Sequence, residues 1–138
     1  MNILFLCVAN SARSQIAEGL AKSMLGADND IRSAGSSASG LVHPNAVLTM
    51  NEIGIDISSH RSKLIDEIEE DFMNNLDYVI TLCAEEVCPV INSNVARLHW
   101  INADPDIKSL NSKELEGSFK QTRENIYKLL KKFLILNT

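Results

Sequence analysis

Residues 3–14 read Ile3-Leu4-Phe5-Leu6-Cys7-Val8-Ala9-Asn10-Ser11-Ala12-Arg13-Ser14, which is an apolar run, a cysteine and a loop of small and polar residues. The apolar run predicts a buried strand over residues 2–6. Apolar residues at positions 16, 17, 20, 21, 24 and 25 predict an amphipathic helix over 14–26, with Gly26 as its stop. Cys7 is therefore expected where a buried strand ends and a loop leads into a helix.

Such a loop can bind an oxyanion. Its amide N–H groups can converge on the anion, and the helix N-terminus adds the positive end of its dipole. The guanidinium of Arg13 offers a planar fork for two oxygens. The same field stabilises a thiolate, so Cys7 is the candidate nucleophile. The expected oxyanion-binding residues are Val8, Ala9, Asn10, Ser11, Ala12, Arg13 and Ser14.

The alternative is a cysteine that only fills core volume, because cysteine is among the most buried residue types. The context favours chemistry. Asn10 tolerates the positive φ that a tightly curled loop requires. Ser11 and Ala12 leave room for an anion, and the Ser14 hydroxyl can donate a hydrogen bond to the sulfur.

Length and composition indicate an ordinary globular protein. A chain of 138 residues, 45% apolar and 22% charged, fits one domain over residues 1–138. No apolar stretch approaches the roughly 20 residues that span a bilayer, and the N-terminus lacks the basic start of a signal peptide, so we expect a cytoplasmic protein without membrane contact. The net charge of −5 and the absence of a dense basic cluster argue against nucleic acid as a partner. We expect a monomer.

Strand and helix patterns alternate along the chain. Strands are expected over 2–6, 30–33, 78–82 and 95–99, and helices over 14–26, 45–53, about 64–74 and about 113–134. This order predicts an α/β fold in three α/β/α layers around a central, mostly parallel, four-stranded sheet. Ligands of such sheets bind beyond the carboxyl ends of the strands, where Cys7, Cys83 and the loop after His99 would emerge. His43 and His60 are expected to be structural, and Trp100 to belong to the core.

The chain has three cysteines, Cys7, Cys83 and Cys88. A small cytosolic protein rarely uses disulfides for stability, so their placement suggests chemistry. Structural zinc is the competing interpretation, because Cys83 and Cys88 precede His99. Their spacing is looser than the usual paired-ligand pattern and there is no second cysteine pair, so we expect neither metal nor cofactor.

The loop resembles the phosphate-binding loop of the low-molecular-weight protein tyrosine phosphatase fold, and in particular of the thioredoxin-coupled arsenate reductases built on it. Further matching segments follow in the order of the family over most of the chain: Ser33-Ala34-Gly35, His43-Pro44-Asn45-Ala46, Gly54-Ile55-Asp56-Ile57-Ser58-Ser59-His60, Asp77-Tyr78-Val79-Ile80-Thr81-Leu82-Cys83, His99-Trp100 and Asp104-Pro105.

The resemblance implies two candidate activities. A phosphatase would use Cys7 as nucleophile and Asp104 as general acid on phosphotyrosine or a small phosphate ester. A reductase would also use Cys83 and Cys88, passing oxidation from Cys7 outward to thioredoxin, and it could keep weak phosphatase activity. Tyrosine phosphatases of this fold place aromatic residues after the Asp-Pro pair, but Asp106-Ile107-Lys108 follows here. A small inorganic substrate, and so arsenate reduction, is favoured.

Two further expectations concern the relay and its surroundings. If Ala84–Val87 formed a helical turn, Cys88 would lie beyond easy disulfide reach of Cys83, so the segment would have to unwind before the last exchange. Certain family members hold potassium through residues corresponding to Asn10, Glu18, Ser33 and an aspartate. Lys63 stands at the aspartate's position, and its ammonium predicts that no potassium binds.

Overall fold

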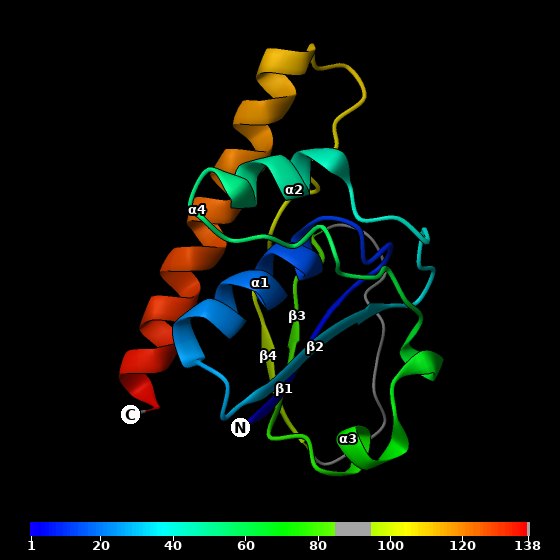
Figure 1. The fold of residues 1–138 in the computed structure, drawn as a ribbon, viewed down its shortest axis with the longest axis vertical. Helices are drawn as coiled ribbons and strands as arrows, with labels where there is room; N and C mark the ends of the chain where they lie inside the picture. The colour runs from blue at the N-terminus through cyan, green and yellow to red at the C-terminus, as the bar shows by residue number, and fades with distance from the viewer. Residues whose placement is uncertain (85–94, 138) are drawn as a thin grey trace.

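The computed structural model describes residues 1–84 and 95–137 (Figure 1). Its strands are β1 (Asn2–Cys7), β2 (Asp30–Gly35), β3 (Tyr78–Thr81) and β4 (Ala96–His99). Its helices are α1 (Arg13–Leu25), α2 (Pro44–Asn51), α3 (Glu70–Asn74), α4 (Ser112–Leu136) and a 3₁₀ turn, η1 (Ile65–Glu67).

The strands form one sheet in the order β2-β1-β3-β4, and every neighbouring pair is parallel. β1 is central: Cys7 aligns with Gly35 of β2, and Leu6 aligns with Thr81 of β3. The carboxyl ends of all four strands therefore meet at one edge, as the alternation of strands and helices predicts.

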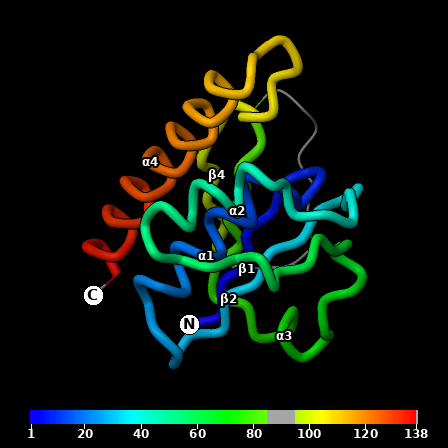
Figure 2. The backbone as a smooth tube through the Cα atoms, turned by 45° about the horizontal axis from the view of Figure 1, so that its top comes forward, coloured from blue at the N-terminus to red at the C-terminus, as the bar shows by residue number. Residues whose placement is uncertain are grey.

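The two faces of the sheet are buried by different elements. Alternate residues of β1 point to opposite faces: Ile3 and Phe5 pack in a cluster with α1, α2 and α4, and Leu4 and Leu6 pack with Ile68 and Phe72. Figures 1 and 2 show α1, α2 and α4 gathered on one side of the molecule and α3 on the other. The predicted three-layer fold is confirmed.

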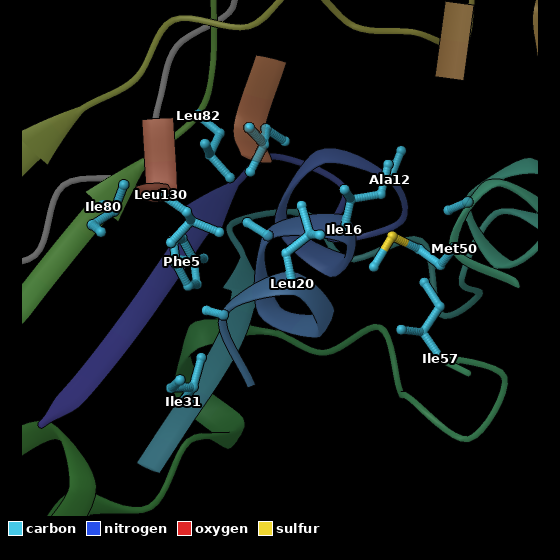
Figure 3. Packing of buried hydrophobic residues seen from close by; sticks show 14 of the residues in the cluster. Phe5, Ala12, Ile16, Leu20, Ile31, Met50, Ile57, Ile80, Leu82 and Leu130 are labelled. Carbon is cyan, nitrogen blue, oxygen red and sulfur yellow. The ribbon is translucent and has the colours of Figure 1, made fainter. Parts of the chain in front are cut away.

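The larger cluster fixes the helix that follows the Cys7 loop. Ile16 and Leu20 of α1 are buried among Phe5, Met50 and Ile57 (Figure 3). Burying side chains of this size stabilises the fold by about 1.5–3 kcal/mol each. The first turn of α1, and the loop in front of it, are thereby anchored to the sheet.

One predicted helix is wrong. The expected helix over about 64–74 is divided into η1 and the short α3, because Ile68 is extended, with φ −78° and ψ 135°. Ile68 is buried against the sheet. Glu69 is extended as well, with φ −58° and ψ 138°, so two consecutive residues leave the helical conformation and divide the predicted helix.

The other boundaries shift by one or a few residues. The final helix runs two residues past the expected end, to Leu136, and α2 ends at Asn51. Asn111 caps α4 by accepting from the Glu114 amide, and the Glu114 side chain accepts from the Asn111 amide. Among residues 1–84 and 95–137, no helix combines the length and apolar character needed to cross a bilayer.

Candidate active site

Cys7 ends β1 and is buried, with 2% of its surface exposed. Its Sγ lies 2.8 Å from the Ser14 Oγ, and the Asn10 amide donates to Sγ over 3.2 Å. A serine hydroxyl and a backbone amide are both donors that stabilise a sulfur anion. The predicted contact between Ser14 and the sulfur is confirmed.

The loop after Cys7 is held from outside by its carbonyl groups. The carbonyls of Val8, Ala9 and Ser11 accept hydrogen bonds of 2.9–3.0 Å from the backbone amides of Ser37, Ser39 and His43. In a trans peptide the N–H points opposite to the C=O, so anchoring the carbonyls outward turns the next amides inward. The Asn10 amide, which shares a peptide unit with the Ala9 carbonyl, indeed donates to Cys7.

Gly35 allows this outer loop to lie so close. A Cβ built at Gly35 would lie 2.3 Å from the Val8 carbonyl oxygen, which no side chain could tolerate. The Gly35 amide donates to the Lys63 carbonyl, so β2 also ties the residue 63 segment to the site. The small-residue segment after Gly35 packs against the Cys7 loop.

Asn10 is the internal support of the loop. It is fully buried and has φ +50°, the left-handed conformation expected from the sequence. Its Nδ2 donates to the hydroxyls of Ser14 and Ser33, and its Oδ1 accepts from the Lys63 amide and from Gln15 Nε2. One side chain thus positions the hydroxyl that contacts Cys7.

A buried carboxylate lies behind Asn10. Glu18 accepts from the Ser33 hydroxyl and pairs with Lys22 over 2.6 Å. Lys63 Nζ lies 3.8 Å and His60 Nδ1 3.7 Å from the same carboxylate. Burial lowers the pKa of both Lys63 and His60, and Glu18 partly opposes the shift in each. Lys63 thus contacts Glu18 through its ammonium and Asn10 through its backbone amide.

The loop after β4 reaches the site through Arg13. Arg13 is buried, and its Nη1 donates to the Asn102 carbonyl over 3.0 Å. The Asn102 amide in turn donates to the Leu82 carbonyl. Asp104 follows two residues later, at an exposed position. The structure therefore brings the loop that carries Asp104 to the arginine of the Cys7 loop.

Cys83 emerges at the same sheet edge. β1 and β3 are hydrogen-bonded neighbours, and the Leu82 amide donates to the Leu6 carbonyl, so Cys83 directly follows the strand beside Cys7. Cys83 is buried and disulfide-bonded, whereas Cys7 is a free thiol. Cys88, and the expected helical turn before it, lie outside the described residues.

Sequence reasoning missed how the loop is supported. The anchors Ser37 and Ser39 and the pairing of His43 lie far from Cys7 in sequence, whereas Gln15 directly follows the loop. Serine and glutamine are common surface residues, so their types carry no signal for this role. Only the Pro44 that follows His43 indicates a helix start there, and His43 does cap α2.

Fold and site together define a class: a parallel α/β protein with a buried free cysteine at the base of an arginine-containing oxyanion loop. The family model for low molecular weight phosphotyrosine protein phosphatase matches residues 2–137. Arsenate reductases of Halalkalibacterium halodurans and Bacillus subtilis are each 45% identical over 133 residues, covering 95% of this chain and 93% of each relative.

Solved structures agree. An arsenate reductase in the phosphate binding state aligns with a TM-score of 0.78 and 29% identity, over 99% of this chain and 98% of that one. A thioredoxin-dependent arsenate reductase of Corynebacterium glutamicum aligns with a TM-score of 0.66 and 30% identity, over 96% of this chain and 61% of that one. The chain belongs to the low molecular weight phosphotyrosine protein phosphatase family and, within it, to the arsenate reductases.

Proposed function

We propose that the chain reduces arsenate to arsenite through a relay of Cys7, Cys83 and Cys88, and that thioredoxin regenerates the enzyme. The observation that carries this proposal is the pairing of β1 with β3, which puts Cys83 next to the strand that ends in Cys7. A phosphatase needs no second thiol, whereas a reductase needs one within reach of the first.

In the first step the Cys7 thiolate attacks arsenic(V) of arsenate bound by the loop amides and Arg13. A sulfur–arsenic bond forms, and one arsenate oxygen leaves as water after protonation. Asp104 supplies that proton, since its loop is tied to Arg13 through Asn102. The Ser14 hydroxyl and the Asn10 amide both contact the sulfur that attacks.

In the second step the Cys83 thiolate attacks the sulfur of Cys7. The sulfur–sulfur bond forms as the sulfur–arsenic bond breaks, and the electron pair of the broken bond reduces arsenic to arsenic(III), which leaves as arsenite. Cys88 then attacks Cys83 and returns Cys7 as a thiolate. The last disulfide takes two electrons from thioredoxin, so each arsenate consumes one dithiol.

The redox states of the two described cysteines suit this sequence. Cys7 is free and Cys83 is disulfide-bonded, the arrangement expected once oxidation has moved outward. The Corynebacterium glutamicum relative is itself thioredoxin-dependent, which supports the same class of reductant here. The phosphate bound by another relative supports recognition of a tetrahedral oxyanion.

The test is arsenite production with thioredoxin, thioredoxin reductase and NADPH, run beside hydrolysis of an aryl phosphate. Cys7→Ser is expected to abolish both activities. Cys83→Ser is expected to abolish arsenate turnover and to keep any weak phosphatase activity, because hydrolysis needs only Cys7. Normal arsenate reduction by Cys83→Ser would contradict the relay, and efficient aryl phosphate hydrolysis without arsenate reduction would favour a phosphatase.

Cys88→Ser tests the order of the exchanges. Without Cys88 the relay stops at the bond between Cys7 and Cys83, so this variant is expected to release one arsenite per enzyme molecule and then stop. Mass spectrometry of a digest is expected to find Cys7 joined to Cys83. Continued turnover of Cys88→Ser with thioredoxin would show that Cys88 lies outside the relay.

A further inference from the structure

His43 lies between the Cys7 loop and the loop that carries Asp104. Its backbone amide donates to the Ser11 carbonyl over 2.9 Å, which fixes it to the Cys7 loop. Its ring Nε2 lies 3.4 Å from Asp106 Oδ1, two residues after Asp104. One residue therefore contacts both parts of the site, which are far apart in sequence.

The tautomer of His43 follows from its second ring nitrogen. Nδ1 accepts a hydrogen bond from the Asn45 amide over 3.0 Å, as the N-cap of α2. An accepting nitrogen carries no proton, so a neutral ring holds its proton on Nε2, the nitrogen that faces Asp106. The cap of α2 thus presents an N–H to the Asp106 carboxylate.

The ring is held in this orientation by α4. His43 stacks on Phe119, with ring centroids 4.6 Å apart and planes tilted by 36°. Phe119 is completely buried, and the His43 side chain is 20% exposed. A ring fixed by a cap on one edge and an aromatic face on the other has little freedom to move away from Asp106.

Asp106 in turn sets the position of Asp104. The Asp106 amide donates to Asp104 Oδ1 over 3.0 Å, and the Pro105 carbonyl between them accepts from the Ser118 hydroxyl on α4. The carboxylate of Asp104 is therefore oriented by the backbone of Asp106. A shift of Asp106 would move the carboxyl group that is to deliver a proton.

We propose that His43 is a positioning residue, which holds Asp104 through Asp106 at a fixed place relative to the Cys7 loop. This inference rests on the proposed function, in which Asp104 protonates the departing oxygen. A displacement of about 1 Å at a reacting group can cost on the order of a hundredfold in rate, so a partly loosened acid should slow the chemical step and leave oxyanion binding intact.

Two substitutions separate positioning from folding. His43→Asn keeps a side-chain oxygen that can cap α2, because asparagine is among the best N-cap residues, but its shorter side chain loses the contact with Asp106. Asp106→Ala removes the same contact from a surface loop and leaves α2 unchanged. Lys108→Ala is the matched control, since the 90% exposed Lys108 also contacts Asp106, over 3.3 Å.

The measurement is arsenite release in a single turnover of the full chain, which is first reduced and then freed of the reductant, as a function of arsenate concentration. His43→Asn and Asp106→Ala are each expected to lower the maximal rate constant about tenfold and to change the half-saturating arsenate concentration less than about twofold. The double variant is expected to be no slower than either single variant, and Lys108→Ala to match the wild type.

The Asp104→Asn background distinguishes the two proposals. With the acid removed, adding His43→Asn is expected to cause no further loss. Two results would overturn the role of His43 and leave the acid role of Asp104 standing. In one, Asp104→Asn slows arsenite release but His43→Asn and Asp106→Ala do not. In the other, the losses in rate multiply when His43→Asn is added to Asp104→Asn. If Asp104→Asn releases arsenite at the wild-type rate, the acid assigned in the proposed function is overturned, and His43 loses its role with it.

Discussion

Single side chains set the state of the sulfur. Ser14 Oγ lies 2.8 Å from Cys7 Sγ and also accepts from Asn10 Nδ2, so its own proton is free to point at the sulfur. Asn10 reaches this position only because asparagine tolerates φ +50°. The contact of Ser14 with the sulfur and the positive φ of Asn10 could be expected from the sequence, because both depend on the identity of one residue.

Ser14→Ala is expected to slow alkylation of Cys7 by iodoacetamide at neutral pH about tenfold, because a hydrogen bond to a charged group contributes roughly 1.5–3 kcal/mol. The measurement uses chains that carry Cys83→Ser and Cys88→Ser, so that only Cys7 reacts. Ser23→Ala, at an exposed position of the same helix, is the control and should react at the parent rate. Equal rates for both variants would contradict the role of Ser14.

The side chain of Lys63 provides a second prediction about a single residue. Its ammonium lies 3.8 Å from the Glu18 carboxylate, which also accepts from the Ser33 hydroxyl. An internal cation leaves no unmet negative charge for an ion to neutralise. Thermal unfolding in potassium chloride and in sodium chloride of equal ionic strength is therefore expected to give the same midpoint. A clear gain in potassium would contradict this expectation.

At the scale of elements, the contact of β2 with the Cys7 loop matters most. Gly35 is the last residue of β2 and aligns with Cys7, while its missing side chain leaves room for the Val8 carbonyl. The outer loop that begins after Gly35 supplies the amides that anchor the Cys7 loop. The geometry of the oxyanion site thus depends on the contact between the end of β2 and the Cys7 loop.

Gly35→Ala is expected to destabilise the chain by about 1–3 kcal/mol, because the added methyl group overlaps the Val8 carbonyl and something must shift. It should also remove stabilisation by phosphate, which depends on the loop. Gly117→Ala is the matched control: a Cβ there meets nothing within 4 Å, and alanine in a helix is better than glycine by about 0.5–1 kcal/mol. Urea unfolding with and without phosphate measures the stability of each variant and its gain in stability from phosphate. A Gly35→Ala chain as stable as the wild type would refute the close contact.

For the molecule as a whole, stability should depend on pH through His60. Burial lowers its pKa from the usual 6.5. His60 therefore binds a proton more readily in the unfolded chain than in the folded chain. Stability therefore rises with pH up to about 6.5 and levels off above, since His60 is then neutral in both states. His60→Gln is expected to flatten this part of the curve.

Urea midpoints between pH 5 and 7.5 test this expectation. His99→Gln is the control, because it removes a histidine at an exposed position at the end of β4. An unchanged slope in His60→Gln would show that protonation of His60 costs the folded state nothing.

The sequence by itself determined the α/β class, the four strands and the loop with Cys7, Arg13 and Ser14. These features depend on local patterns: apolar runs, helical periodicity and residues with special backbone preferences. The strand order could be expected only from family resemblance, and it places Cys83 just after the strand that pairs with β1. The break at Ile68 could not be expected, because the apolar residues 65, 68 and 72 also fit one face of an unbroken helix.

Only the tertiary structure decided which distant residues support the site. The contacts that do so join segments separated by up to 63 positions. Ser37 and Ser39 donate to the loop carbonyls, Lys63 lies beside Glu18, and His43 faces Asp106. Such contacts follow from strand register and helix packing, which are collective properties of the folded chain. A hydrogen bond needs two atoms within about 3 Å, and no local pattern specifies that distance between remote segments.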